Sequence, residues 1–168
     1  KRWLDPTAGW GDRLRCAISY GCEYLGIDSN SAMQPAYKAI IADSGADPKK
    51  YKVRDGKFQD SRIVGKYDLI FTSPPFYTVE KYQGMTHWDN VQHFMDEFLI
   101  PLFKKSVRHL ENKGHLVLYI EDRADSPFIQ LMKDHVHDTH PELKYEGAFY
   151  YEGFSRRLRP YYVWKLNV

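Results

Sequence analysis

Short apolar, β-branched runs alternate with longer amphipathic segments along this chain, and the alternation predicts an α/β fold. The expected strands are Arg2–Asp5, Glu23–Asp28, Tyr51–Arg54, Tyr67–Thr72, His115–Glu121, Tyr145–Tyr151 and Tyr161–Leu166. Helices are expected over about 12–20, up to Asp43, over about 90–110, and from Ser126-Pro127 onward. Strands that alternate with helices indicate a parallel sheet with helices on both of its faces.

The connection between the last two strands is too short for a helical crossover, so these strands should be antiparallel. The predicted sheet therefore has six parallel strands and one antiparallel strand. Within the 90–110 helix we expect Pro101 to cause a kink or a break. We expect Asn112-Lys113-Gly114 to close this helix, with Gly114 as a left-handed cap.

The most informative motif is Ser73-Pro74-Pro75-Phe76, which directly follows the predicted 67–72 strand. Proline cannot donate to a sheet, so we expect the carbonyls of Ser73 and Pro74 to lack ladder partners and to be held rigidly. One hydroxyl lies beside these carbonyls, and the aromatic residues Phe76 and Tyr77 follow. Such a corner suits a flat ring that bears an exocyclic amine.

Acidic residues and glycines follow the first three strands, at the edge where open α/β sheets bind ligands. Gly9 and Gly11 permit close backbone approach, but G-x-G without a third glycine is a weak dinucleotide match. Asp5 suits a ligand with an ammonium group, and Asp28 ends the second strand, where an acid commonly binds ribose hydroxyls. Asp55 could face an adenine ring. The structural alternatives are a tight turn for the first loop, a helix cap for Asp28 and a simple turn for Asp55.

Three segments together carry a family resemblance: Asp5-Pro6-Thr7-Ala8-Gly9-Trp10-Gly11-Asp12-Arg13-Leu14, Gly26-Ile27-Asp28 and Thr72-Ser73-Pro74-Pro75-Phe76. They resemble the S-adenosylmethionine (SAM)-dependent amino-methyltransferases of DNA, which methylate N4 of cytosine or N6 of adenine. Glu80-Lys81-Tyr82 adds a resemblance to phage and viral members. The resemblance implies the Rossmann-like class I methyltransferase fold, SAM as cofactor and DNA as partner. A serine in the tetrapeptide is typical of the N4-cytosine enzymes.

The resemblance also implies residue roles. Ser73 Oγ and the Pro74 carbonyl accept hydrogen bonds from the target amine, Pro75 completes the rigid corner, and Phe76 stacks on a flipped base. Asp5, Pro6, Gly9 and Gly11 surround the methionine part of SAM, Asp28 binds its ribose and Asp55 faces its adenine. These assignments cover both the catalytic and the cofactor-binding candidates.

The chain departs from this family at several points. Trp10 and Thr7 replace the small residue and the Phe that many relatives have. No segment is long enough for a separate target-recognition domain, and the helix that usually precedes the first strand is missing. We therefore expect any sequence-specific recognition to need a domain or partner subunit outside this chain.

Several charged groups have two interpretations. Arg156, Arg157 and Arg159 lie in the loop before the last strand and either hold phosphates, together with Tyr77, or form a solvated turn. Glu121-Asp122 either borders the target pocket or caps the helix at Ser126. Plain surface is expected for Lys49-Lys50 and for Lys104-Lys105, the latter on a helix face away from the pocket.

A metal site is not expected, because His135 and His137 are two positions apart and cannot share a helix face. With His140 they suit a polar helix end. Cys16 and Cys22 make no disulfide framework, which favours a reducing compartment, and no apolar run is long enough to span a membrane. We expect a cytoplasmic protein, or a phage- or virus-encoded one that acts in its host cell.

The 168 residues are enough for one domain spanning 1–168, and the early first strand suggests a trimmed domain or a piece of a longer chain. A net charge of +2 neither requires nor excludes nucleic acid. Two other functions stay open: methylation of an RNA base, and a non-catalytic SAM-fold subunit that binds nucleic acid. Methylation of protein glutamine is disfavoured, since those enzymes use Asn-Pro-Pro-Tyr and this chain has Ser73.

Overall fold

The computed structural model describes residues 1–75, 77, 87–122, 124–153 and 156–168. Over these residues the strands are β1 (Arg2–Asp5), β2 (Glu23–Asp28), β3 (Tyr51–Asp55), β4 (Tyr67–Thr72), β5 (Leu110–Tyr119), β6 (Leu143–Glu152) and β7 (Leu158–Leu166). The helices are α1 (Asp12–Ser19), α2 (Gln34–Asp43), α3 (Val91–Phe94), α4 (Ile100–His109) and α5 (Ile129–Thr139). A 3₁₀ turn, Ser31–Met33, precedes α2, and a π-helical turn, Met95–Leu99, joins α3 to α4.

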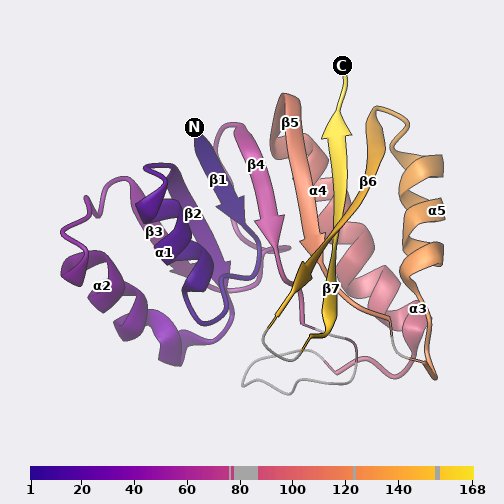
Figure 1. The fold of residues 1–168 in the computed structure, drawn as a ribbon, viewed down its shortest axis with the longest axis horizontal. Helices are drawn as coiled ribbons and strands as arrows, with labels where there is room; N and C mark the ends of the chain where they lie inside the picture. The colour runs from indigo at the N-terminus through magenta and orange to yellow at the C-terminus, as the bar shows by residue number, and fades with distance from the viewer. Residues whose placement is uncertain (76, 78–86, 123, 154–155) are drawn as a thin grey trace.

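The described strands form one seven-stranded sheet in the order β3-β2-β1-β4-β5-β7-β6 (Figure 1). Neighbouring strands from β3 to β5 are parallel, and β7 is antiparallel to both β5 and β6. This confirms the predicted α/β sheet of six parallel strands and one antiparallel strand. The chain adds β2 and β3 on one side of β1 and then β4 and β5 on its other side, so the strand order reverses between β1 and β4. Open α/β sheets bind ligands at such a switch point.

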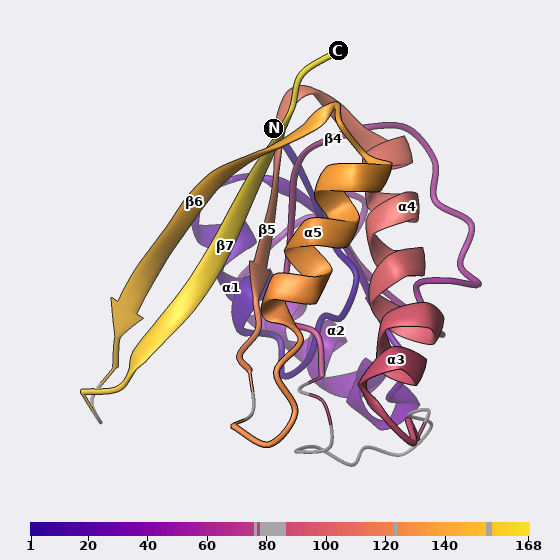
Figure 2. The ribbon, with the colours of Figure 1, turned by 90° about the vertical axis from the view of Figure 1, so that its right-hand side faces the viewer.

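Helices cover both faces of the sheet, with α4 and α5 on one side and α1 on the other (Figure 2). The alternation along β1 divides the core accordingly: Trp3 packs with Leu14, Tyr37 and other residues of α1 and α2, whereas Leu4 joins the cluster that contains residues of α4 and α5. No helix among the described residues is long and apolar enough to cross a membrane.

The region expected to be one helix over 90–110 is helical up to His109, with Pro101 in the first turn of α4, directly after the π-helical turn. A proline is tolerated there because the π-helical turn before it already interrupts the regular α-helical hydrogen bonds. The N–H group that proline lacks is therefore not needed to continue them. The predicted closure at 112–114 is wrong, since β5 already starts at Leu110. Lys113 rather than Gly114 has the positive φ, 64°. Gly114 is needed for space: a β-carbon there would lie 2.8 Å from the Glu111 carbonyl oxygen.

The start of α5 depends on Asp122. Its Oδ1 accepts hydrogen bonds from the backbone N–H groups of Phe128 (2.7 Å) and Ile129 (2.8 Å). The first helical donors are thereby satisfied by a side chain that lies just after β5, and α5 begins at Ile129 instead of Ser126. Of the two interpretations of Asp122, the structure supports the helix cap.

Candidate functional site

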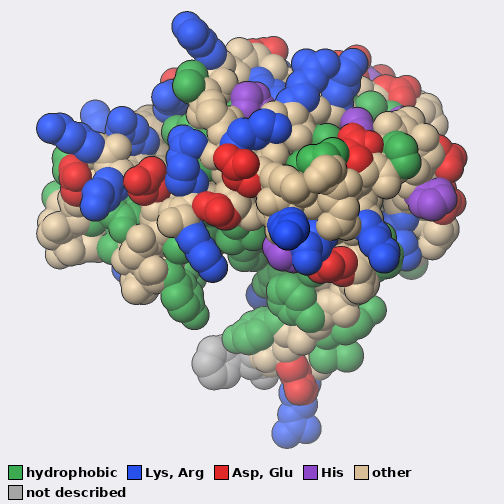
Figure 3. All heavy atoms as spheres, turned by 90° about the horizontal axis from the view of Figure 1, so that it is seen from above, with side chains coloured by type: hydrophobic (Ala, Val, Ile, Leu, Met, Phe, Trp, Pro, Cys, Tyr) green, Lys and Arg blue, Asp and Glu red, His purple; other side chains and the backbone are tan. Residues whose placement is uncertain are grey.

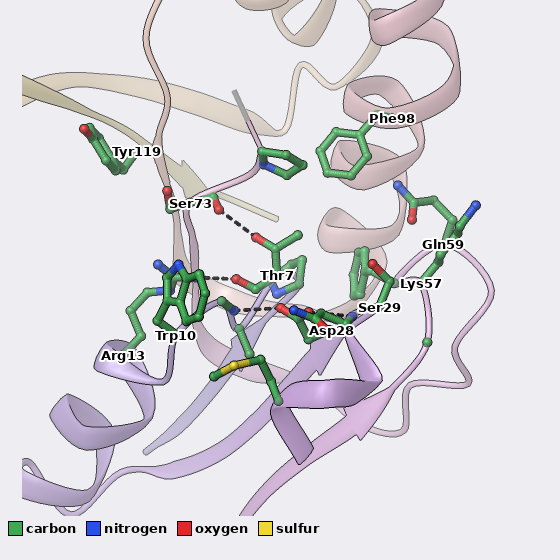
Figure 4. A pocket seen from close by; sticks show the side chains of 18 of the residues that line it. Thr7, Trp10, Arg13, Asp28, Ser29, Lys57, Gln59, Ser73, Phe98 and Tyr119 are labelled. Atoms are coloured by element: carbon green, nitrogen blue, oxygen red, sulfur yellow. Dashed lines mark hydrogen bonds between the residues drawn. The ribbon is translucent and has the colours of Figure 1, made fainter. Parts of the chain in front are cut away.

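A cavity of about 530 Å³ opens at the carboxyl edge of the sheet (Figure 4). Its lining comes from the β1–α1 loop, the end of β2, the loop after β3, the residues after β4 and the ends of β5 and β7 that meet at this edge. The volume lies within the range of small-molecule sites, about 300–1,000 Å³. The cavity therefore occupies the place where the sequence predicts a ligand.

The two glycines of the first loop have different roles. Gly9 lines the cavity with φ 61°, and its N–H donates to Asp28 Oδ2 at 2.7 Å. Gly11 does not line it: at φ 90° it packs on α2, where a β-carbon would lie 2.6 Å from Ile40 Cδ1. The prediction that Gly11 faces the ligand is corrected, because close helix packing explains this glycine. Pro6 lines the cavity as expected.

Asp5 also lies outside the cavity lining, which corrects its expected place beside the cofactor. Its side chain is fully buried, and Oδ2 accepts from Arg13 Nε (2.7 Å) and from the Tyr24 hydroxyl (2.6 Å). Oδ1 accepts from Thr72 Oγ1 at 2.6 Å. Burial and the Asp5 charge raise the pKa of Tyr24 well above its ordinary value, so Tyr24 stays a neutral donor. Asp5 is a structural anion.

Asp28 lines the cavity, in agreement with its predicted position. Oδ2 accepts from the Gly9 N–H, and Oδ1 accepts from the Asn30 N–H at 2.9 Å. Burial raises the pKa of Asp28, although the two backbone donors oppose the shift. Each carboxylate oxygen keeps a further lone pair, so the side chain can still accept hydrogen bonds from a ligand.

Asp55 is exposed and lies outside the lining, so its expected contact with an adenine ring is corrected. It pairs with Asp28 in the β2–β3 ladder, and the residues directly after it line the cavity. The loop that lines the cavity is Gly56–Asp60. No sequence signal marks this loop beyond Gly56 itself.

Lys105 holds the 56–60 loop from behind. Its Nζ donates to the carbonyl oxygens of Phe58 (2.6 Å), Gln59 (2.9 Å) and Ser61 (2.5 Å), and lies 5.0 Å from the Phe58 ring centroid. Burial lowers the pKa of Lys105. The prediction of plain surface holds for the exposed Lys104 and is wrong for Lys105, which is bound to a cavity loop more than 40 residues earlier in the chain.

Ser73 lies across the cavity from Asp28, and both line it (Figure 4). The Ser73 carbonyl accepts a hydrogen bond from Thr7 Oγ1 at 2.9 Å, and Thr7 Oγ1 lies 2.6 Å from Thr72 Oγ1. The expectation that this carbonyl lacks a partner is therefore wrong. A chain of contacts runs from buried Asp5 through Thr72 and Thr7 to Ser73.

Two acceptors of the diproline corner remain. Among the described residues, none forms a hydrogen bond with Ser73 Oγ or with the Pro74 carbonyl oxygen. Pro75 lines the cavity, whereas Pro74 is buried and does not. Phe76, expected to stack on a base, lies outside the described residues.

Tyr77 was expected to contact nucleic acid, and this prediction is corrected. Its side chain is buried in the core, and its ring lies 5.5 Å from that of Phe94. Tyr77 thus packs in the core beside a residue of α3 instead of facing the cavity.

The charge of the lining favours a cationic ligand. Four carboxylates, those of Asp12, Asp28, Asp60 and Glu97, line the cavity, against the two cations Arg13 and Lys57. Arg13 is moreover held by Asp5 and by the Thr7 carbonyl. An excess of negative charge repels a pyrophosphate, which argues against a dinucleotide.

The three arginines of the β6–β7 connection are not equivalent. Arg157 forms an ion pair with Glu121, which also accepts from the Tyr119 hydroxyl at 2.9 Å. Arg156 is exposed with φ 56°, and Arg159 is half-buried in β7. Arg156 and Arg159 remain candidates for phosphate contacts, while Arg157 already has an anionic partner.

The histidines show no metal-like arrangement. His135 and His137 lie on α5, and His140 Nδ1 lies 3.5 Å from Glu142. No group of three or more His, Cys, Asp or Glu side chains suited to a metal ion occurs in the described part of the chain.

No protein-family model matches the chain, and neither does any curated protein. Solved structures do. A methyltransferase from Pyrococcus furiosus gives a TM-score of 0.70 at 16% identity, covering 99% of this chain and 75% of that one. An rRNA methylase from Streptococcus thermophilus gives 0.67 at 11% identity, with 100% and 88% covered.

An O-methyltransferase from Brevibacillus brevis, in complex with S-adenosyl-L-homocysteine, gives a TM-score of 0.68 at 10% identity, covering 99% of this chain and 67% of that one. These identities are too low to establish an activity, but the alignments span almost the whole chain. Together with the sheet order they show that this chain has the Rossmann-like fold of the class I methyltransferases.

Proposed function

We propose that this protein transfers a methyl group from SAM to the exocyclic amine of a flipped nucleobase in DNA, with cytosine N4 favoured over adenine N6. One observation carries the proposal: Ser73, whose hydroxyl has no partner among the described residues, lines the same cavity as Gly9 and Asp28. The amine-binding corner and the cofactor loop, far apart in the sequence, thus share one space.

The residues present fit SAM. The ligand carries an ammonium and a sulfonium and no phosphate, which suits the excess of carboxylates in the lining. The Gly9 backbone and Asp28 would hold the methionine part and the ribose, and the Gly56–Asp60 loop would border the adenine. The similar O-methyltransferase is described in complex with S-adenosyl-L-homocysteine, which supports this choice. When bound, SAM supplies an electrophilic methyl group.

In this proposal Ser73 positions the nucleophile. Its Oγ accepts a hydrogen bond from the target amine, which directs the nitrogen lone pair toward the cofactor side of the cavity. The Thr7 hydroxyl fixes the Ser73 carbonyl. Held in this way, the amine nitrogen would take the methyl group that bound SAM supplies in exchange for the sulfur–carbon bond, and would lose one proton to solvent. Placement supplies most of the rate enhancement.

RNA is the second candidate substrate, because one similar structure is an rRNA methylase. A pocket for a flipped base serves either polymer. A non-catalytic nucleic-acid-binding subunit is the third possibility, and a Ser73 hydroxyl that lines the cavity with no partner in the described part of the chain argues against it. Sequence-specific recognition would come from a domain or partner outside this chain.

Transfer of labelled methyl groups tests the proposal. The protein is incubated with methyl-labelled SAM and DNA or RNA, and the products are digested to nucleosides. We expect label on N4-methyl-2′-deoxycytidine from DNA, and about a hundredfold slower transfer by Ser73→Ala. SAM binding by Ser73→Ala should be unchanged. Absence of label in both polymers, with SAM bound, would refute the enzymatic proposal.

A further inference from the structure

The β6–β7 hairpin forms an arm that extends away from the helices (Figure 2). In the view from above, the arm projects at the lower edge with hydrophobic side chains along it and basic side chains at its tip (Figure 3). Several of its large apolar side chains are exposed, namely Phe149, Tyr150, Tyr151 and Leu158. No strand pairs with the outer edge of β6 in the described chain.

Three rings form a continuous stack across the base of this arm. Tyr119, Tyr161 and Phe149 are direct cross-strand neighbours on β5, β7 and β6. The ring centroids of Tyr119 and Tyr161 are 4.9 Å apart with planes 20° from parallel, and those of Tyr161 and Phe149 are 4.8 Å apart and 7° from parallel. We call these three residues the aromatic column.

The aromatic column leads out of the cavity. Tyr119 and Tyr161 line the cavity, whereas Phe149 ends the column on the edge strand and is 51% exposed. The column thus offers a flat aromatic face beside the space assigned to the target base. Exposing a large apolar ring to water is unfavourable, and one more flat ring stacked on the end of the column would cover it.

Basic groups continue from the end of the column. Arg159 pairs with Tyr151 two residues along from Phe149 and Tyr161, on the same face of the arm. Arg156 is exposed at the tip. The acids nearby are Glu152, which is exposed, and Glu121, which Arg157 already neutralises. The far end of the column thus offers cations to a polyanion.

We propose that the aromatic column is a stacking site for a base of single-stranded nucleic acid, next to the nucleotide whose base occupies the cavity. The base stacks on the outer face of Phe149, and Arg159 and Arg156 contact the phosphates that follow. Base–aromatic stacking is tolerant of sequence, so the site adds affinity without adding recognition. The inference rests on the proposed function, because it takes the polymer to be the substrate of the cavity.

Binding of a fluorescently labelled 12-nucleotide single strand, measured by anisotropy, tests the proposal. Phe149→Ala should weaken binding about 5- to 100-fold, as expected for the loss of one stacked base. Tyr150→Ala is the matched control: this tyrosine is 61% exposed, more than Phe149, but it pairs with Pro160 on the opposite face of the arm, and its loss should change binding less than twofold. Circular dichroism melts confirm that each variant is folded.

Phe149→Leu distinguishes the binding of a nucleic-acid base from the binding of a peptide or of a second copy of the chain. Leucine keeps an apolar surface but has no flat ring, so oligonucleotide binding should fall as in Phe149→Ala. Arg159→Gln should lower the salt dependence of binding by about one phosphate contact. The proposal is overturned if Phe149→Leu binds the strand like wild type, if Tyr150→Ala weakens binding equally, or if wild type dimerises through this face.

The inference and the proposed function fail in different ways. If methyl transfer occurs and Phe149→Ala binds and transfers like wild type, the aromatic column is wrong and the function stands. If the strand binds through Phe149 but no polymer is methylated, the column stands and the proposed reaction is wrong. SAM affinity should be equal in wild type and in Phe149→Ala.

Discussion

Asp5 and Asp28 are the last residues of neighbouring parallel strands, β1 and β2, yet they have different environments. Asp5 is fully buried, and its donors are Arg13, Tyr24 and Thr72. Asp28 lines the cavity and receives two backbone N–H groups. A carboxylate at the end of a strand can thus hold the fold together or face a ligand, and the positions of its donors decide which.

The difference follows from what surrounds each strand end. β1 is a central strand, with β2 and β4 on either side and Arg13 of α1 above it, so Asp5 is enclosed by groups that can donate to it. Beyond Asp28 the chain turns away toward α2, which leaves one side of the carboxylate open to the cavity. Asp5 therefore holds the elements around the site together, and Asp28 is available to bind a ligand.

The largest effect is expected from Asp5→Asn. The change leaves the Arg13 guanidinium without its anionic partner, and breaking a buried pair costs about 3–5 kcal/mol. Urea denaturation should show this loss in the free energy of unfolding. Asp28→Asn, which has no charged partner comparable to Arg13 among the described contacts and mainly disturbs two backbone donors, should cost about 1–2 kcal/mol. Equal losses in the two variants would contradict the distinction between these acids.

Lys105→Met tests whether the 56–60 loop, which lines the cavity, depends on the hydrogen bonds from Lys105 of α4. Three loop carbonyls lose their donor, so we expect SAM affinity to fall about tenfold while the global unfolding midpoint changes little. Calorimetric titration measures the affinity. Lys104→Met, on the exposed neighbour, is the control and should bind SAM like wild type. Unchanged affinity in Lys105→Met would show that the loop keeps its shape unaided.

Thr7→Val removes the hydroxyl that connects buried Asp5, through Thr72, to the Ser73 carbonyl. The Ser73 carbonyl loses its donor, which should cost about 1 kcal/mol of stability and lower kcat roughly three- to tenfold with SAM affinity unchanged. Thr7→Ser keeps the hydroxyl and should restore kcat. If Thr7→Val transfers methyl groups as fast as wild type, the hydroxyl does not position Ser73.

The smallest effect concerns pH. Burial raises the pKa of Asp28 in the folded protein, so between its ordinary pKa and the raised one the folded state binds more protons than the unfolded state. The contribution of Asp28 to the free energy of unfolding therefore falls as pH rises through this window. Subtracting the Asp28→Asn curve from that of wild type isolates the slope. A difference that rises with pH would mean that the two backbone donors outweigh burial.

Much of the fold could be predicted from the sequence, because period-two and helical patterns are local. The bounds of β1, β2 and β4 were predicted correctly, and so was the direction of β7. The early start of β5 was not predicted. The ladder between β4 and β5 is irregular, since Leu110 pairs with Tyr67 and His115 with Leu69, and such an irregularity depends on contact between the two strands. For the same reason the sequence wrongly predicts a left-handed helix cap at Gly114.

The site was predicted in outline only. Position along the chain placed Ser73 and Asp28 at the correct edge, since the ends of parallel strands meet there. It could not show that Asp5 points inward or that Tyr77 packs in the core, since side-chain direction is set by tertiary donors and neighbours. Lys105 carried no signal at all, because its partners are loop carbonyls distant in sequence.

Titration of SAM into wild type and Asp28→Ala, followed by calorimetry, tests the central claim most directly. Asp5→Asn, held at a temperature where it is folded, serves as the third sample. We predict one SAM per wild-type chain, affinity at least tenfold weaker in Asp28→Ala, and affinity within about threefold of wild type in Asp5→Asn. No heat from wild type, or equal affinity in Asp28→Ala, would contradict the assignment of this cavity to SAM.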